Sequence, residues 1–327
     1  MARPRIAIVG AGSFGTALAP ALLRAAYSIA AVIARSSERS PRTASSTKAQ
    51  RLAAMVGAHA SYDLSGVSAD VIWFCVPDGE IRAAALALSQ TPRRFDKLRV
   101  GSFAKNARRT GQPEFEWDKF DWKGTVALHS SGALSSDELS VLRERGAAVA
   151  SVHPLMTFVR GATGRRSSMR ESRALAGVPF AIEGDASAVR MARRLVKDLG
   201  GIAYAIRKDD KAAYHAWGTF ASPLLTALLA TTEHVAALAG VNRRAVKQRM
   251  LPILRQTLAN YAAFGAADGF SGPMVRGDVN TVKRHLKVLR GMPPAREVYV
   301  ALAGAALEYL PVKNKKSLKR ILDSARE

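Results

Sequence analysis

The octapeptide IVGAGSFG, residues 8–15, constrains the fold of this chain more than any other feature. Gly10, Gly12 and Gly15 have GxGxxG spacing, directly after a strand-like run and at the start of a helical pattern. In such a strand–turn–helix unit, the glycines permit a tight turn, close approach of the backbone to a pyrophosphate, and packing of the helix on the strand. The N–H groups at the helix N-terminus then face the phosphates. We therefore expect a dinucleotide site that includes Gly10, Gly12, Ser13, Phe14 and Gly15.

The rest of the first half alternates short β-branched runs with helical patterns, which is typical of a parallel sheet covered by helices on both faces. We expect strands at Arg5–Gly10, in SIAAVIAR ending at Arg35, and at Ala69–Pro77, Gly124–Gly132 and residues 147–154. Residues 178–206 read as one more βαβ unit that extends the sheet, and the pattern breaks between Thr91 and Lys123, which we treat as an insertion. From Lys208 onward the chain is rich in Ala and Leu, with helical patterns only.

The predicted fold class is α/β, a Rossmann-type doubly wound sheet followed by an all-helical C-terminal domain. We expect a dinucleotide-binding domain over residues 1–165 and a linker with the sheet extension over 166–207. An all-helical domain for substrate binding and dimerisation follows over 208–327. A length of 327 residues suits two domains.

Composition narrows the class of protein further. With 48% hydrophobic and 23% charged residues, the chain is an ordinary globular sequence. Its single cysteine, Cys75, excludes a disulfide framework and a cysteine zinc site, and we expect no metal. No apolar run reaches the roughly 18 residues of a membrane span, and the N-terminus has no signal-peptide pattern. We therefore expect a cytoplasmic protein without a membrane partner.

A net charge of +23 sets the expected partners. Such a surface suits either nucleic acid or an anionic ligand. The basic residues are scattered in pairs, except in the tail at Lys313–Arg320, and neither a zinc-finger spacing nor an RNA-recognition motif accompanies them. We therefore favour a diffuse basic surface that attracts an anionic cofactor and a small anionic metabolite, and we do not expect a nucleic-acid partner.

The end of the second expected strand bears on which dinucleotide binds. An NAD site usually has an acidic residue there to accept hydrogen bonds from the ribose, whereas this chain has Arg35, Ser36 and Ser37. An arginine beside two hydroxyls suits a 2′-phosphate, so the pattern favours NADP(H), with NAD less favoured. In the alternative, Glu38 supplies the acid and Arg35 is a surface residue. Val76 and Pro77, at the end of the strand Ala69–Pro77, complete the expected cofactor contacts.

Five further segments, taken together, resemble one bacterial family. They are HSSGALSSDEL, SVHPLMTF, VPFAIEGD, KAAYHAWGTFAS and FSGPMVRGDVNTVKRHL. The chain resembles Rossmann-like proteins that carry the domain of unknown function 2520, which are similar to pyrroline-5-carboxylate reductase and prephenate dehydrogenase within the 6-phosphogluconate dehydrogenase superfamily. The resemblance covers nearly the whole chain outside the insertion. It implies an NADP-binding domain followed by a helical domain that often forms a homodimer, without implying a particular substrate.

Candidate substrate contacts lie where ligands bind in such folds, at the carboxyl ends of the strands. Ser130 and Ser131 follow one strand and His153 ends the next, and comparable Ser/Gly loops and His-Pro turns in the related dehydrogenases contact substrate or nicotinamide. Alternatively, Ser131 caps a helix and His153 is a turn residue before proline. Ser135 with Glu138 forms a capping box, so Ser135 and Ser136 are left out of the site.

Arg276 is a candidate clamp for a substrate carboxylate, because its planar fork matches a carboxylate bidentately. In the alternative, Arg276 forms a salt bridge that holds its loop. Asp278 is expected to cap the helix that starts near Val279.

The helix expected over Asp209–Leu225 carries Lys211, His215 and Ser222. At about 100° per residue, His215 lies about 40° and Ser222 about 20° from Lys211, so the three share one stripe. The related dehydrogenases place a lysine or polar residue on this first long helix. We assign Lys211 and His215 as candidate proton donors, and Ser222 as the residue that orients the substrate. The alternative is a solvated helix start, with His215 packed beside Trp217. Pro223 stands where relatives have Asn, and it should interrupt the helix.

Together these features predict an NADPH-dependent oxidoreductase that reduces a C=O or C=N group of a small carboxylate-bearing metabolite. A 2-keto acid such as ketopantoate, or a cyclic imino acid, would suit the site. The alternative from another class is a regulator or sensor that binds NADP without turnover.

Overall fold

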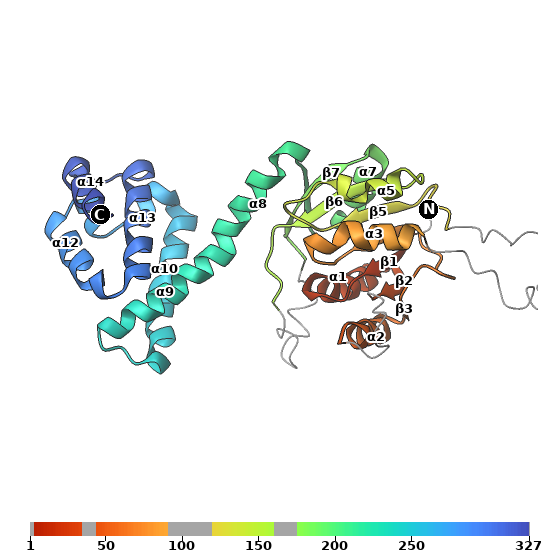
Figure 1. Ribbon diagram of the computed structural model, residues 1–327, viewed down its shortest axis with the longest axis horizontal. Coiled ribbons are helices and arrows are strands. Elements are labelled where there is room, and N and C mark those ends of the chain that lie inside the picture. Colours follow the sequence, from red (N-terminus) through yellow and green to blue (C-terminus); the bar gives the residue numbers. More distant parts are fainter. Residues whose placement is uncertain (1–2, 35–43, 91–119, 160–174, 327) are drawn as a thin grey trace, which may run out of the picture. The chain divides into compact units, whose positions relative to one another are not determined.

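The computed structural model describes residues 3–34, 44–90, 120–159 and 175–326. It divides into two compact units, Met1–Gly218 and Thr219–Glu327. Figure 1 shows the first unit as a sheet flanked by helices and the second as a set of helices.

An eight-stranded sheet forms the frame of the first unit, with strand order β3-β2-β1-β4-β5-β6-β7-β8. The strands are β1 (Arg5–Val9), β2 (Ser28–Ile33), β3 (His59–Ser61), β4 (Val71–Phe74), β5 (Val126–His129), β6 (Ala148–Pro154), β7 (Pro179–Gly184) and β8 (Ile202–Ala205). All neighbouring pairs are parallel except β6 and β7, which pair antiparallel. The predicted fold class is confirmed, and the antiparallel junction is the departure from an all-parallel sheet.

Helices cover both faces of this sheet because its central strands are apolar on both sides. They are α1 (Ser13–Arg24), α2 (Ala44–Val56), α3 (Ile81–Ser89), α5 (Ser140–Arg143) and α7 (Ala186–Asp198), with the single turns η1 (Asp78–Glu80), η2 (Ser136–Leu139) and η3 (Lys208–Asp210). In β1, Ile6 and Ile8 pack with residues of α1, α2 and α7, whereas Ala7 and Val9 pack with residues of α3 and α5. This alternation follows from the two-residue repeat of a strand, and it gives the unit one core on each face.

The last helix of the first unit is α8 (Lys211–Thr219), and the chain stays helical beyond it. The elements of the second unit are η4 (Phe220–Leu224), α9 (Leu225–Leu238), α10 (Arg243–Gly269), α11 (Pro273–Arg276), α12 (Val279–Val288), η5 (Leu289–Gly291), α13 (Pro293–Tyr309) and α14 (Lys315–Asp323). Residues 220–224 form a π-helical turn that contains Pro223. A wider turn is one way for a helix to accommodate a residue that has no N–H to donate, so the expected interruption takes this form.

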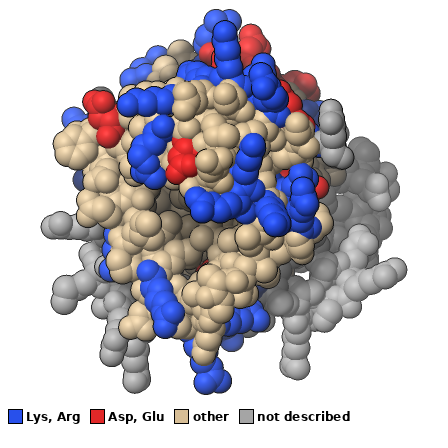
Figure 2. Space-filling model, turned by 90° about the vertical axis from the view of Figure 1, so that its left-hand side faces the viewer, with Lys and Arg blue, Asp and Glu red and all other residues tan. Residues whose placement is uncertain are grey.

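The core of the second unit lies between α11, α12, α13 and α14, where Met274, Val282, Val300 and Leu318 are buried together. Asp278 caps α12 by accepting a hydrogen bond from the Thr281 backbone N–H at 3.0 Å, as predicted. Lysines and arginines on α12 and α14 are exposed, and Figure 2 shows basic groups spread over one face of the molecule, where they outnumber the acidic groups.

None of the described helices is by itself long and apolar enough to cross a membrane. Among the described residues, one sharply bent pair of helical segments, Lys208–Leu238 and Arg243–Arg276, is long and apolar enough only when the two are taken together.

Candidate active site

The glycine-rich loop has the backbone geometry that the sequence predicts for close approach to a phosphate. Gly10 has φ +101°, and a Cβ added there would lie 2.8 Å from the Cys75 carbonyl oxygen and 2.9 Å from Val76 Cγ1. A Cβ on Gly15 would meet the Gly10 carbonyl oxygen. Any larger residue at these two positions would therefore push the loop away from β4.

The N-terminus of α1 fits an anion. Gly12 is its N-cap, so no side chain occupies the first N–H groups, and the first turn contains no acidic residue. These N–H groups and the helix dipole are the elements that hold a pyrophosphate in this type of fold. The Phe14 ring packs on Trp73 and Phe158 at centroid distances of 6.2 and 5.1 Å. Its side chain is therefore committed to the core, which leaves its backbone for the cofactor.

Four parallel neighbours, β1, β4, β5 and β6, bring their carboxyl ends to one edge of the sheet. Four parts of the chain lie at this edge: the glycine loop, the segment Cys75–Asp78, the loop Ser130–Gly132, and His153. Val76 is half-buried beside Gly10, and Pro77 is exposed. Arg35, Ser36 and Ser37 lie outside the described residues, so the preference for NADP(H) stays a prediction.

The loop Ser130–Gly132 is held in place by its own hydroxyls. Trp73 Nε1 donates to Ser130 Oγ at 2.8 Å, and Ser131 Oγ donates to the Asp78 carboxylate at 2.7 Å. The Leu134 backbone N–H donates to Ser131 Oγ at 2.9 Å. Ser131 therefore stabilises a turn, and it does not cap a helix as the alternative proposed, because η2 starts at Ser136 and its N-cap is Ser135. Substrate contact by either serine stays a prediction.

His129, which the sequence did not single out, is fully buried beneath this loop. Its Nδ1 accepts from the Ser131 backbone N–H at 3.1 Å, and its Nε2 lies 2.9 Å from the Ser135 carbonyl oxygen. Because a carbonyl can only accept, the ring carries its proton on Nε2 and is neutral. Burial lowers the pKa of His129 to about 4, which agrees with a neutral ring.

Lys211 is also buried, with 1% of its surface exposed, so the alternative of a solvated helix start is wrong for this residue. Its Nζ donates to the Ser131 carbonyl oxygen at 3.0 Å and to Ser151 Oγ at 2.7 Å. Burial lowers the pKa of Lys211 to about 8, against the attraction of Glu183 and Asp78. Lys211 therefore supports the Ser131 loop from inside the protein. Lys211 and His215 thus differ in exposure, the first buried and the second exposed, although they lie one turn apart on the predicted stripe.

Two imidazoles, those of His153 and His215, lie against Gly132 at the position that a Cβ would occupy. A Cβ on Gly132 would lie 2.7 Å from His215 Cδ2 and 2.8 Å from His153 Nε2, so only glycine allows both rings this close. The two ring centroids are 6.2 Å apart. His215 is exposed, and His153 is half-buried within β6, not in a turn as the alternative for it proposed.

Tyr214 completes the group from the same helix as His215. Its hydroxyl lies 2.9 Å from His153 Nδ1, and the two rings meet edge to face. Burial raises the pKa of Tyr214 above its ordinary value, and burial lowers the pKa of His153 to about 4, with help from the charge of Lys211. Both side chains are thus neutral near pH 7. The sequence signal for Tyr214 was its place one turn after Lys211.

Glu183 on β7 is a further buried residue that the sequence did not single out. It accepts hydrogen bonds from the Ser136 backbone N–H at 2.6 Å and from Ser136 Oγ at 2.9 Å. Ser135 caps the same turn, as predicted. Ser136 and Glu183 therefore tie the start of η2 to the sheet beside the candidate site.

Ser222 and Arg276 belong to the second unit. Ser222 lies in the π turn, and its carbonyl accepts from the Thr226 hydroxyl. Arg276 is exposed in the last turn of α11. The hydrogen bonds from Thr281, and then the charge of Arg276, hold the pKa of Asp278 below its usual range. Participation of Ser222 and Arg276 in one site with the sheet-edge residues stays a prediction.

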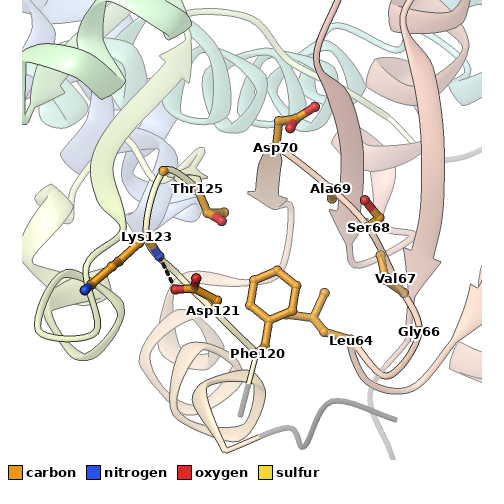
Figure 3. A pocket seen from close by; sticks show the side chains of 11 residues that line it. Leu64, Gly66, Val67, Ser68, Ala69, Asp70, Phe120, Asp121, Lys123 and Thr125 are labelled. Carbon is orange, nitrogen blue, oxygen red and sulfur yellow. Dashed lines mark hydrogen bonds between the residues drawn. The ribbon is translucent and has the colours of Figure 1, made fainter. Parts of the chain in front are cut away.

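A cavity of about 480 Å³ lies at the opposite edge of the sheet, beside the amino ends of β4 and β5. Figure 3 shows Phe120 and Asp121 on one side of it and Asp70 and Ser68 on the other. The Asp70 carboxylate accepts from the Arg5 backbone N–H, and Asp121 accepts from that of Lys123. Ligands in open α/β sheets bind at the carboxyl ends of the strands, so this cavity is not the candidate active site.

Comparison with protein families agrees with this geometry. Residues 178–306 match the model of a domain of unknown function, DUF2520. Residues 5–95 match the model described as NADP oxidoreductase, coenzyme F420-dependent. The resemblance predicted from the sequence is confirmed, and the N-terminal match identifies the chain as an NAD(P)-dependent oxidoreductase. Among curated proteins, no sequence match was found.

Solved structures similar to this chain have the same fold. One is from Bacteroides fragilis, BF3122, proposed to be an NADP oxidoreductase, with TM-score 0.62, 18% identity and coverage of 93% of this chain and 97% of that one. Another is a reductive aminase from Aspergillus terreus, in complex with NADPH and ethyl-5-oxohexanoate, with TM-score 0.56, 13% identity and coverage of 98% and 99%. A pyrroline-5-carboxylate reductase from Coxiella burnetii has TM-score 0.51, 11% identity and coverage of 99% and 98%. At these identities the similarity establishes the fold.

Proposed function

We propose that the chain is an NADPH-dependent reductase of a C=O or C=N group in a small carboxylate-bearing metabolite, such as a 2-keto acid or a cyclic imino acid. One observation carries the proposal. The glycine loop and the paired imidazoles around Gly132 lie at the same carboxyl edge of one parallel sheet. Such an edge is where cofactor and substrate meet in doubly wound folds.

In this proposal, Gly10, Gly12 and the N-terminus of α1 hold the pyrophosphate, and Arg35 with Ser36 and Ser37 holds the 2′-phosphate. When bound, NADPH supplies a hydride to an electrophilic carbon. The chain must then hold the substrate and provide a proton to its oxygen or nitrogen. The exposed ring of His215 is the proposed proton donor, because it lies against Gly132 and solvent can return a proton to it after each turnover.

We propose for Lys211 a role different from proton donation. Its ammonium is bound to Ser131 and Ser151 inside the protein, so we propose that it positions the Ser131 loop and contributes a buried positive charge behind it. That charge favours an anionic substrate at this edge. We propose that Arg276 clamps the substrate carboxylate and that Ser222 orients the substrate.

A homodimer through the helical unit is the proposed assembly. On α10, the apolar side chains of Ile253, Leu258, Tyr261 and Phe264 are 59–67% exposed. Several large apolar side chains exposed on one helix are typical of an interaction surface. A mass measurement in solution by light scattering tests this proposal, and a monomer at micromolar concentration would contradict it.

The test of the activity is NADPH oxidation with a panel of 2-keto acids and cyclic imino acids. His215→Ala should lower kcat on the best substrate by about 10²–10⁴-fold, the usual contribution of a positioned proton donor. His234→Ala is the matched control, since His234 is an exposed histidine on α9 in the second unit, and it should leave the rate unchanged. If His215→Ala and Lys211→Ala both turn over like the wild type, this helix is not part of the mechanism. Tight NADPH binding without turnover of any panel member would instead support a non-catalytic sensor.

A further inference from the structure

The hydrogen bond between Tyr214 and His153 sets which nitrogen of His153 carries the proton. The Tyr214 hydroxyl has one proton to donate, and the acceptor that lies at hydrogen-bonding distance among the described residues is His153 Nδ1, at 2.9 Å. Interaction with the nearby Tyr204 hydroxyl also raises the pKa of Tyr214, but that hydroxyl is buried and lies outside hydrogen-bonding geometry with every described residue. A donor proton buried without an acceptor costs about 1–3 kcal/mol. Donation from Tyr214 to Nδ1 is therefore the favoured arrangement.

A neutral imidazole with an occupied Nδ1 lone pair carries its proton on Nε2. His153 Nε2 faces the space above Gly132, beside the edge of the His215 ring. No described residue accepts a hydrogen bond from this nitrogen. The ring is held by β6 on one side and by Tyr214 on the other. His153 thus offers a fixed N–H to whatever occupies the space beside Gly132.

We propose that His153 acts as a neutral N–H donor to the oxygen of a substrate carbonyl, with Tyr214 as the positioning residue that fixes its tautomer. This inference rests on the proposed reductase function and narrows its substrate to a 2-keto acid. A carbonyl oxygen has lone pairs to accept from Nε2–H, and they gain charge as the hydride adds to the carbon and the C=O π pair moves onto oxygen. His215 then supplies the proton that completes the alcohol. A protonated imine has no lone pair on nitrogen until the C=N π pair moves there as the hydride adds, so Nε2–H has no acceptor in the bound substrate and cannot orient it.

The tautomer can be measured directly by long-range ¹H–¹⁵N NMR correlation, which distinguishes the protonated nitrogen of a histidine ring from the bare one. The chain has six histidines, so His153→Gln assigns the signal of His153, and His59→Gln on β3 is the matched control. We expect His153 in the wild type to be protonated at Nε2, and Tyr214→Phe to convert it to a mixture of tautomers. A proton on Nδ1 in the wild type, or an unchanged tautomer in Tyr214→Phe, would overturn the inference.

Kinetics on the same variants provide the second test. Tyr214→Phe should lower kcat for a 2-keto acid about tenfold with little change in KM, whereas a merely structural role would lower the melting temperature and raise KM. The wild type should also prefer the 2-keto acid to a cyclic imino acid in kcat/KM, and the opposite preference would overturn the substrate assignment. The NMR result does not depend on turnover. Failure of the reductase proposal itself would therefore appear separately, as no NADPH oxidation with any panel member.

Discussion

Protonation of His129 should destabilise the first unit as the pH falls below neutral. The ring is fully buried, and both its nitrogens are bonded to backbone groups that require the neutral Nε2–H form. Its pKa is lowered from 6.5 to about 4 by burial. Between these two values the unfolded chain binds a proton that the folded chain does not, so stability rises with pH across this window and is lost as the pH falls through it.

The size of the effect follows from the pKa difference. A shift of one pKa unit corresponds to about 1.4 kcal/mol, so His129 alone should cost about 2 kcal/mol of unfolding free energy between pH 7.5 and pH 5. The full loss of about 3 kcal/mol should be reached near pH 4. His153 has a similarly lowered pKa and adds a contribution of the same sign.

Urea unfolding followed by tryptophan fluorescence measures the free energy of unfolding of the first unit, because all four tryptophans lie between residues 73 and 217. The comparison is between wild type, His129→Gln and the exposed control His59→Gln, each at pH 7.5 and pH 5. His129→Gln should be less stable than wild type at pH 7.5 but should lose about 2 kcal/mol less on acidification. The control should lose as much as wild type. If wild type and His129→Gln lose the same free energy, the reasoning about the neutral buried ring is wrong.

Three further outcomes follow from single contacts. Gly132→Ala should lower turnover at least tenfold and cost about 1–3 kcal/mol of stability, as overpacking usually does, because the new Cβ would displace His153 or His215. The control Gly79→Ala, at a glycine with open space around it, should change neither turnover nor stability. Equal activity of the two variants would contradict the proposed site. The stability of the wild type should rise by up to about 3 kcal/mol between pH 8 and pH 10.5, because burial lowers the pKa of Lys211 to about 8 and the unfolded chain keeps that proton to higher pH. Lys211→Met should lack this rise. Parallel curves of stability against pH for wild type and variant would refute the prediction. Asp278→Ala should lower the free energy of unfolding by about 1 kcal/mol through loss of the α12 cap. The control Asp323→Ala, which breaks an exposed ion pair with Arg326, should change it by less than about 0.5 kcal/mol. Unfolding of the helices followed by circular dichroism measures both values.

The sequence alone determined the features that depend on neighbours along the chain. The glycine spacing of residues 10–15 and the β-branched runs around it predicted a strand, a tight turn and a helix. Gly10 and Gly15 have the close contacts that this spacing requires. Ser135 and Asp278 were predicted as caps for the same reason, because capping joins residues two or three positions apart. The order of the other strands and helices of the first unit likewise followed from periodicity and segment length, whereas α2 and β3 were not predicted.

Only the tertiary structure decided which polar groups meet at the sheet edge. Ser131 bonds to Asp78 across 53 residues, and Lys211 bonds to Ser131 across 80. Such pairs depend on which strands are neighbours and on where a helix packs, and a local sequence pattern contains no information about either. Helical spacing correctly placed Lys211 and His215 one turn apart, but it could not tell that one is buried under a loop and the other exposed beside His153. Burial and partners, which set the protonation state of each group, exist only once the distant segments have come together.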